Sequence, residues 1–109
     1  MENISRSKNS LAHRIATAFK NFKAFVFQSD IDDRNTVMRL INSTGLSHLL
    51  EIKPLDTRYT IYIIYPREKP CRRKCIYDEK LTGIDLNRCI DRCIHDLIEK
   101  LAQRLLSES

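Results

Sequence analysis

The sequence has few of the residues that interrupt regular structure. It contains two glycines, three prolines and no tryptophan among 109 residues. This scarcity excludes a low-complexity linker and indicates defined helices and strands. No apolar run approaches the roughly 20 residues that a transmembrane helix needs. The densest run, Tyr59 to Tyr65, is short and includes threonine and tyrosines. We therefore expect one small domain that is soluble or peripherally attached to a membrane.

Catalytic signatures are also missing. The histidines His13, His48 and His95 are scattered through the chain, and each fits a surface or capping role better than that of a base or ligand. The sequence contains no nucleophile-elbow motif and no glycine-rich phosphate loop. We expect no enzyme activity and no cofactor.

Acidic residues are scarce at the start of the chain, where Glu2 is the only one before Asp30. From Ser10 onward, apolar residues recur at three- and four-residue spacing: Leu11, Ile15, Phe19, Phe22 and Val26. This pattern predicts a basic amphipathic helix after a frayed start. Such a helix fits either a core-facing role or, by composition, a mitochondrial presequence. Ala24 to Gln28 is alternatively a short strand, because its residues have strong β preference.

The middle of the chain predicts a short helix and then a β-hairpin. Val37, Leu40 and Ile41 form an apolar face on a helix that ends at Gly45. Two extended runs follow, one over 48–53 and one over 58–65, joined by a turn over 54–57 that contains proline and aspartate.

Four cysteines form two Cys-x3-Cys pairs, Cys71/Cys75 and Cys89/Cys93, with thirteen residues between them. On a helix, residues i and i+4 share a face about 6 Å apart along the axis, so two antiparallel helices can meet pair to pair. Of the three connectivities that four cysteines allow, we prefer the nested one, which joins Cys75 to Cys89 and Cys71 to Cys93. Zinc is the rival interpretation, although structural zinc sites usually use Cys-x2-Cys spacing.

The second cysteine pair lies on a strongly predicted C-terminal helix, which Thr82 or Asp85 can cap. A broad apolar stripe runs along it: Leu86, Ile90, Cys93, Ile94, Leu97, Leu101 and Leu105. Charged residues occupy the opposite face, so the stripe requires a packed partner. We predict that its later part is exposed and binds apolar segments through Leu97, Ile98, Leu101, Leu105 and Leu106.

Residues 70–109 resemble the small Tim proteins, the twin Cys-x3-Cys chaperones of the mitochondrial intermembrane space. The resemblance rests on Cys71-Arg72-Arg73-Lys74-Cys75, on Lys80-Leu81-Thr82 before Cys89-Ile90-Asp91-Arg92-Cys93, and on Gln103-Arg104 near the end of the helix. It implies a helical hairpin with disulfides Cys71–Cys93 and Cys75–Cys89. It also implies hexameric assemblies with other small Tim-like subunits that shield hydrophobic precursors.

The chain also departs from that family, because Pro66, Pro70 and a β-like run stand where the family has a long first helix. We expect an α+β fold, with an N-terminal extension over 1–65 and a twin Cys-x3-Cys hairpin over 66–109. The resemblance, together with these departures from it, is consistent with two functions. The first is an intermembrane-space protein that escorts hydrophobic inner-membrane proteins, and the second is a non-catalytic structural subunit of an inner-membrane respiratory complex.

A run of basic residues surrounds the first cysteine pair: Arg67, Lys69, Arg72, Arg73 and Lys74. It is typical of a solvated face, and contact with an anionic partner or a lipid surface is the alternative. Nucleic acid is not an expected partner, since Tyr77 is the only aromatic residue near these basic side chains.

Overall fold

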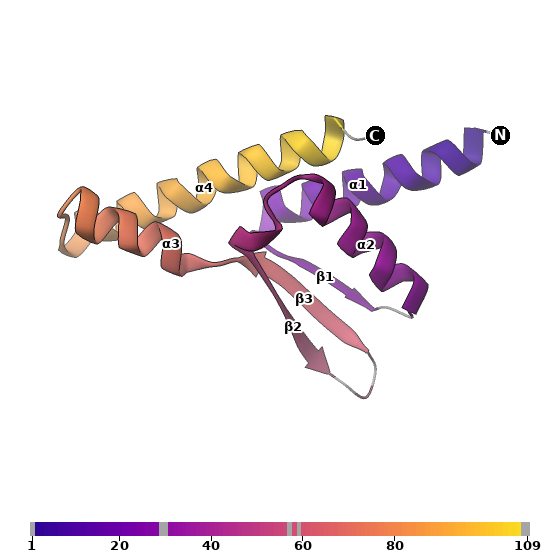
Figure 1. Ribbon diagram of the computed structural model, residues 1–109, viewed down its shortest axis with the longest axis horizontal. Helices are drawn as coiled ribbons and strands as arrows, with labels where there is room; N and C mark the ends of the chain where they lie inside the picture. The colour runs from indigo at the N-terminus through magenta and orange to yellow at the C-terminus, as the bar shows by residue number, and fades with distance from the viewer. Residues whose placement is uncertain (1, 29–30, 57, 59, 108–109) are drawn as a thin grey trace.

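Helices stand at both ends of the described chain, and a small sheet lies between them (Figure 1). This computed structural model describes residues 2–28, 31–56, 58 and 60–107. Side chains are described for all of these residues except 2–10 and 31–33. The elements in chain order are α1 (Glu2–Phe22), β1 (Phe25–Gln28), α2 (Ile31–Ser43), a 3₁₀ turn (Ser47–Leu49), β2 (Leu50–Asp56), β3 (Ile61–Pro66), α3 (Glu68–Arg73), a π-helical turn (Lys74–Asp78) and α4 (Gly83–Ser107).

The three strands form an antiparallel sheet in the order β1-β3-β2. In the register, Val26 lies opposite Ile63, and Ile63 lies opposite Lys53 on its other side. Because side chains alternate along a strand, Phe25 and Phe27 face the core while Val26, which is 53% exposed, points away from it. The helices therefore cover one face of the sheet.

The main core lies between that face and helices α1, α2 and α4. Its buried side chains come from all of these elements: Ala12, Ile15, Ala16, Phe19, Phe25, Phe27, Val37, Leu40, Ile41, Leu46, Leu50, Ile64, Ile98, Leu101, Ala102 and Leu105. Helix α4 runs alongside α1, so the first and last helices of the described chain share this core (Figure 1).

The predicted first helix is present but longer than expected, since α1 begins at Glu2 and not near Ser10. Two residues assigned to its apolar face are not on it. Phe22 ends the helix and is 77% exposed, and Lys23 follows with a positive φ of 60°. Val26 belongs to β1, so it follows strand alternation and not helical periodicity. The alternative prediction of a strand between Ala24 and Gln28 is confirmed.

The predicted β-hairpin is confirmed, with its turn displaced toward β3. Pro54 lies inside β2 and pairs with Tyr62, next to a register irregularity between Pro54 and Asp56. Proline is tolerated there because β2 is an edge strand, where an amide donor is not needed on the open side. The carboxylate of Asp56 accepts a hydrogen bond of 2.9 Å from the Arg58 amide, which closes an Asx turn.

Cys71 lies on α3, which begins at Glu68, so Pro70 occupies the first turn of that helix, where a missing amide donor costs little. The predicted second helix also forms, and Gly45 follows it with a φ of +74°. With the C-terminal hairpin stapled by two disulfides, the predicted α+β fold is confirmed.

Candidate functional site

Two disulfides join α4 to the segment formed by α3 and the π-helical turn. One links Cys71 to Cys93 and the other links Cys75 to Cys89, with Cα–Cα distances of 5.7 and 6.0 Å. The nested connectivity is therefore confirmed. On the loop-entropy view, the bridge across the shorter loop contributes about 3 kcal/mol by restricting the unfolded chain.

The two bridges lie in a small second core, whose buried residues are different from those of the main core. Cys71, Cys75 and Ile90 are buried at its centre, and Leu86, Cys89, Cys93 and Ile94 pack against them. Ile94 also packs against the main core. Helix α4 therefore contributes to both cores: its first half packs in the second core, and its second half packs in the main core.

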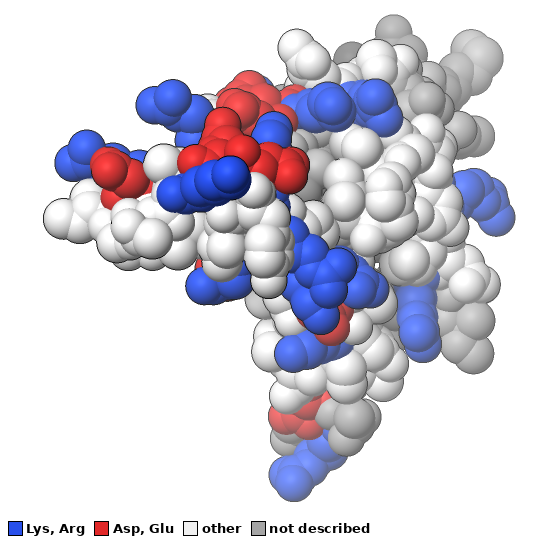
Figure 2. All heavy atoms as spheres, turned by 60° about the vertical axis from the view of Figure 1, so that its left-hand side comes forward, with Lys and Arg blue, Asp and Glu red and all other residues white. Residues whose placement is uncertain are grey.

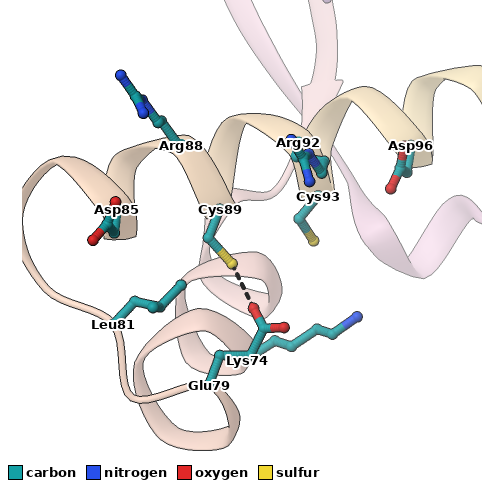
Figure 3. A pocket seen from close by; sticks show the side chains of 9 residues that line it. All are labelled: Lys74, Glu79, Leu81, Asp85, Arg88, Cys89, Arg92, Cys93 and Asp96. Atoms are coloured by element: carbon teal, nitrogen blue, oxygen red, sulfur yellow. Dashed lines mark hydrogen bonds between the residues drawn. The ribbon is translucent and has the colours of Figure 1, made fainter.

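The four sulfurs differ in their exposure. Cys71 is 4% exposed and Cys75 is fully buried, whereas Cys89 and Cys93 are only partly buried. The two α4 cysteines line an open hollow of about 590 Å³ (Figure 3). Its lining is otherwise mostly charged: Lys74, Glu79, Leu81, Asp85, Arg88, Arg92 and Asp96. We call this feature the α4 hollow.

The charged side chain of Glu79 contacts one of the two bridges. Its Oε2 lies 2.9 Å from Cys89 Sγ (Figure 3). The sulfur carries no hydrogen in the disulfide, so this is a contact of a carboxylate oxygen with a bonded sulfur. The turn that carries Glu79 is held by backbone hydrogen bonds from the Glu79 amide to the Lys74 carbonyl (3.2 Å) and from the Leu81 amide to the Cys75 carbonyl (3.1 Å).

Cys75, Glu79 and Cys89 also place their ligand atoms within 4.8 Å of one another, as metal-binding groups do. The thiolate is the form of cysteine that binds metals. Because the two sulfurs are bonded to each other, neither is a thiolate in this structure. The sequence alone does not indicate a role for Glu79, because a single glutamate in a turn belongs to no recognisable motif.

The predicted apolar binding stripe is mostly covered. Ile98, Leu101 and Leu105 are buried in the main core, where α1 packs against them, so the expectation that they are exposed is wrong. Leu97 is partly buried, and Leu106 is 40% exposed. Helical periodicity identified the apolar face correctly but could not show that the chain covers it with its own first helix.

The other candidate groups remain apart. His13, His48 and His95 are exposed, and His95 Nε2 lies 3.7 Å from a Glu99 carboxylate oxygen, one turn further along α4. All five residues of the basic run are exposed. Two of them have contacts, since Arg72 pairs with Glu68 at 2.7 Å and Arg67 Nε donates to the Leu50 carbonyl at 3.1 Å. Figure 2 shows Lys and Arg interleaved with Asp and Glu at this end of the molecule.

No protein-family model matches this sequence, and comparison with curated proteins and with solved structures finds no similar chain. Among the described residues, no helix has the length and apolar character that crossing a membrane requires.

Proposed function

We propose that this protein is a non-catalytic structural subunit of a mitochondrial inner-membrane complex, located in the intermembrane space and held in shape by its oxidised hairpin. The observation that carries the proposal is the cover on α4. Leu101 and Leu105 are fully buried under α1 and the rest of the main core. A helix that already has an intramolecular partner fits a rigid subunit better than a carrier that must offer its apolar face to clients.

The compartment is supported by the disulfides and by the resemblance of residues 70–109 to the small Tim family. Disulfides persist in oxidising compartments and are rare in the cytosol. A small chain that crosses the outer membrane reduced and is then oxidised acquires a hairpin that the reduced chain lacks.

Import into isolated mitochondria tests this proposal. The full chain, synthesised reduced, should become protease-protected and oxidised, and it should lose protection when the outer membrane alone is ruptured. The matched control is the double variant Cys75→Ser, Cys89→Ser, which we expect to enter but not to accumulate. Protection that survives rupture of the outer membrane would place the protein in the matrix and contradict the proposal.

The assembly state separates the subunit from the second candidate, a small-Tim-like carrier of hydrophobic inner-membrane proteins. The carrier is favoured by the broad apolar stripe on α4, which would be uncovered if α1 moved away. Co-migration with a large membrane complex on native gels supports the subunit. A free hexamer that keeps an apolar peptide in solution supports the carrier and overturns our preference.

A further inference from the structure

The two disulfides are reachable from one side only. In thiol–disulfide exchange a thiolate attacks one sulfur along the line of the S–S bond, and the rate depends on access to that sulfur. Cys71 and Cys75 are enclosed in the second core with Ile90, so an external thiolate has no approach to them. Cys89 and Cys93 line the α4 hollow, which is open to solvent. In each bridge, the α4 sulfur is the one that exchange can reach.

The charges around the hollow distinguish these two sulfurs. Three cations line it (Lys74, Arg88 and Arg92), and so do three carboxylates (Glu79, Asp85 and Asp96), so its lining has no net formal charge. Glu79 is the carboxylate in contact with a sulfur, since its Oε2 lies 2.9 Å from Cys89 Sγ, and it therefore repels an anionic thiolate at that sulfur. Figure 3 shows the Cys93 sulfur pointing into the same hollow, and Glu79 contacts Cys89 and not Cys93.

We propose that the α4 hollow is a thiol–disulfide exchange site, that an external thiolate enters at Cys93 Sγ, and that Glu79 shields Cys89. The attacking thiolate forms a bond to Cys93 Sγ while the Cys71–Cys93 bond breaks. Cys71 leaves as a thiolate and takes a proton from water. A second thiolate then attacks the external sulfur of the mixed disulfide, releases Cys93 as a thiolate and completes a two-electron reduction by two thiols.

This inference goes beyond the proposed function, because it depends on the disulfides and the charges around them and not on a compartment or a complex. It predicts an order of opening, in which Cys71–Cys93 opens before Cys75–Cys89. It also predicts which cysteine carries the external group: that group is found on Cys93 of α4, and the released thiol is Cys71 of α3.

The first test is limited reduction of the oxidised full chain with reduced glutathione, followed by acid quenching, alkylation and tryptic mass mapping. Cleavage after Arg72, Lys74, Arg88 and Arg92 places the four cysteines in four separate peptides. We expect early species with glutathione on Cys93 and an alkylated Cys71. Glutathione on Cys71 or Cys75, or earlier opening of the other bridge, overturns the proposal.

The second test changes the shield without changing its size. Glu79→Gln should raise the rate at which Cys75–Cys89 opens about tenfold, since a like charge a few ångströms away in a partly screened setting has an effect of that order. Asp96→Asn is the matched control, because Asp96 lines the same hollow and Glu79 is the carboxylate in contact with Cys89. We expect this control to leave the order of opening unchanged.

Ionic strength separates a shielding role for Glu79 from a merely structural one. Added salt should raise the rate at which Cys75–Cys89 opens in the wild-type protein relative to the Glu79→Gln variant, because salt screens the carboxylate. Glu79→Asp keeps the negative charge, so this variant should retain most of the protection of Cys75–Cys89. An equal rate for the wild-type protein and Glu79→Gln at low salt refutes the shield, and a rate increase that salt does not alter assigns Glu79 a structural role.

Discussion

The cover that α1 provides for α4 makes a sharp prediction about Leu101. Its side chain is fully buried in the main core, on the face of α4 that the sequence alone assigned to client binding. Replacing a buried leucine with alanine costs 2–5 kcal/mol, through lost transfer free energy and the cavity that remains. Taking about 3 kcal/mol and a urea m-value of about 1.5 kcal/mol per M, Leu101→Ala should lower the midpoint of unfolding by roughly 2 M.

The measurement is equilibrium urea unfolding of the oxidised full chain, followed by far-UV circular dichroism. Leu106→Ala is the matched control, since Leu106 lies five residues further along α4 and is 40% exposed. Its free energy of unfolding should change by less than about 1 kcal/mol. Similar midpoints for the two variants would refute the reasoning, because they would mean that α1 does not cover Leu101 in solution.

Three further predictions concern the contact between α2 and α4 and the surface of the sheet. Gly45→Ala should lower the free energy of unfolding by about 1 kcal/mol, because Gly45 has a φ of +74° that alanine adopts only with strain, and an unchanged urea midpoint would contradict this. Arg104→Met should cost about 1 kcal/mol in the same assay, since Arg104 Nη1 donates a 2.7 Å hydrogen bond to the Thr44 carbonyl at the end of α2, and a cation is favourable there. A hydrogen bond and charge attraction from Tyr65, followed by attraction from Glu51, raise the pKa of Lys53 above its ordinary 10.5. The resulting stabilisation is fully present below about pH 10.5 and is lost as the pH rises through the higher folded-state pKa. When urea unfolding is measured at increasing alkaline pH, Lys53→Met should therefore lose less stability than the wild-type protein.

Local patterns in the sequence predicted the hairpin and its bridges well. The Cys-x3-Cys spacing puts both cysteines of a pair on one helical face, so the nested connectivity follows once two such faces meet across a bend. The β-branched and aromatic run in β3 likewise identified a strand, and β2 was found although its proline was assigned to the turn. These predictions succeeded because each depends on residues that are close together in the chain.

The sequence did not reveal contacts between residues that are far apart in it. The stripe on α4 requires a partner, but periodicity is silent on whether that partner is a client protein or α1, which lies at the other end of the chain. Phe22 and Val26 were misassigned for a related reason, since helical spacing continues by chance past the point where the helix ends. Glu79 gains its importance only when the turn that carries it folds back over Cys89.

The pairing of the first and last helices also bears on how the polypeptide reaches its native state. Ile15 and Phe19 have no complete burial site until Leu105 has left the ribosomal exit tunnel, because residues from both segments build one core. The main core can therefore be completed only after α4 has been synthesised and has packed against α1.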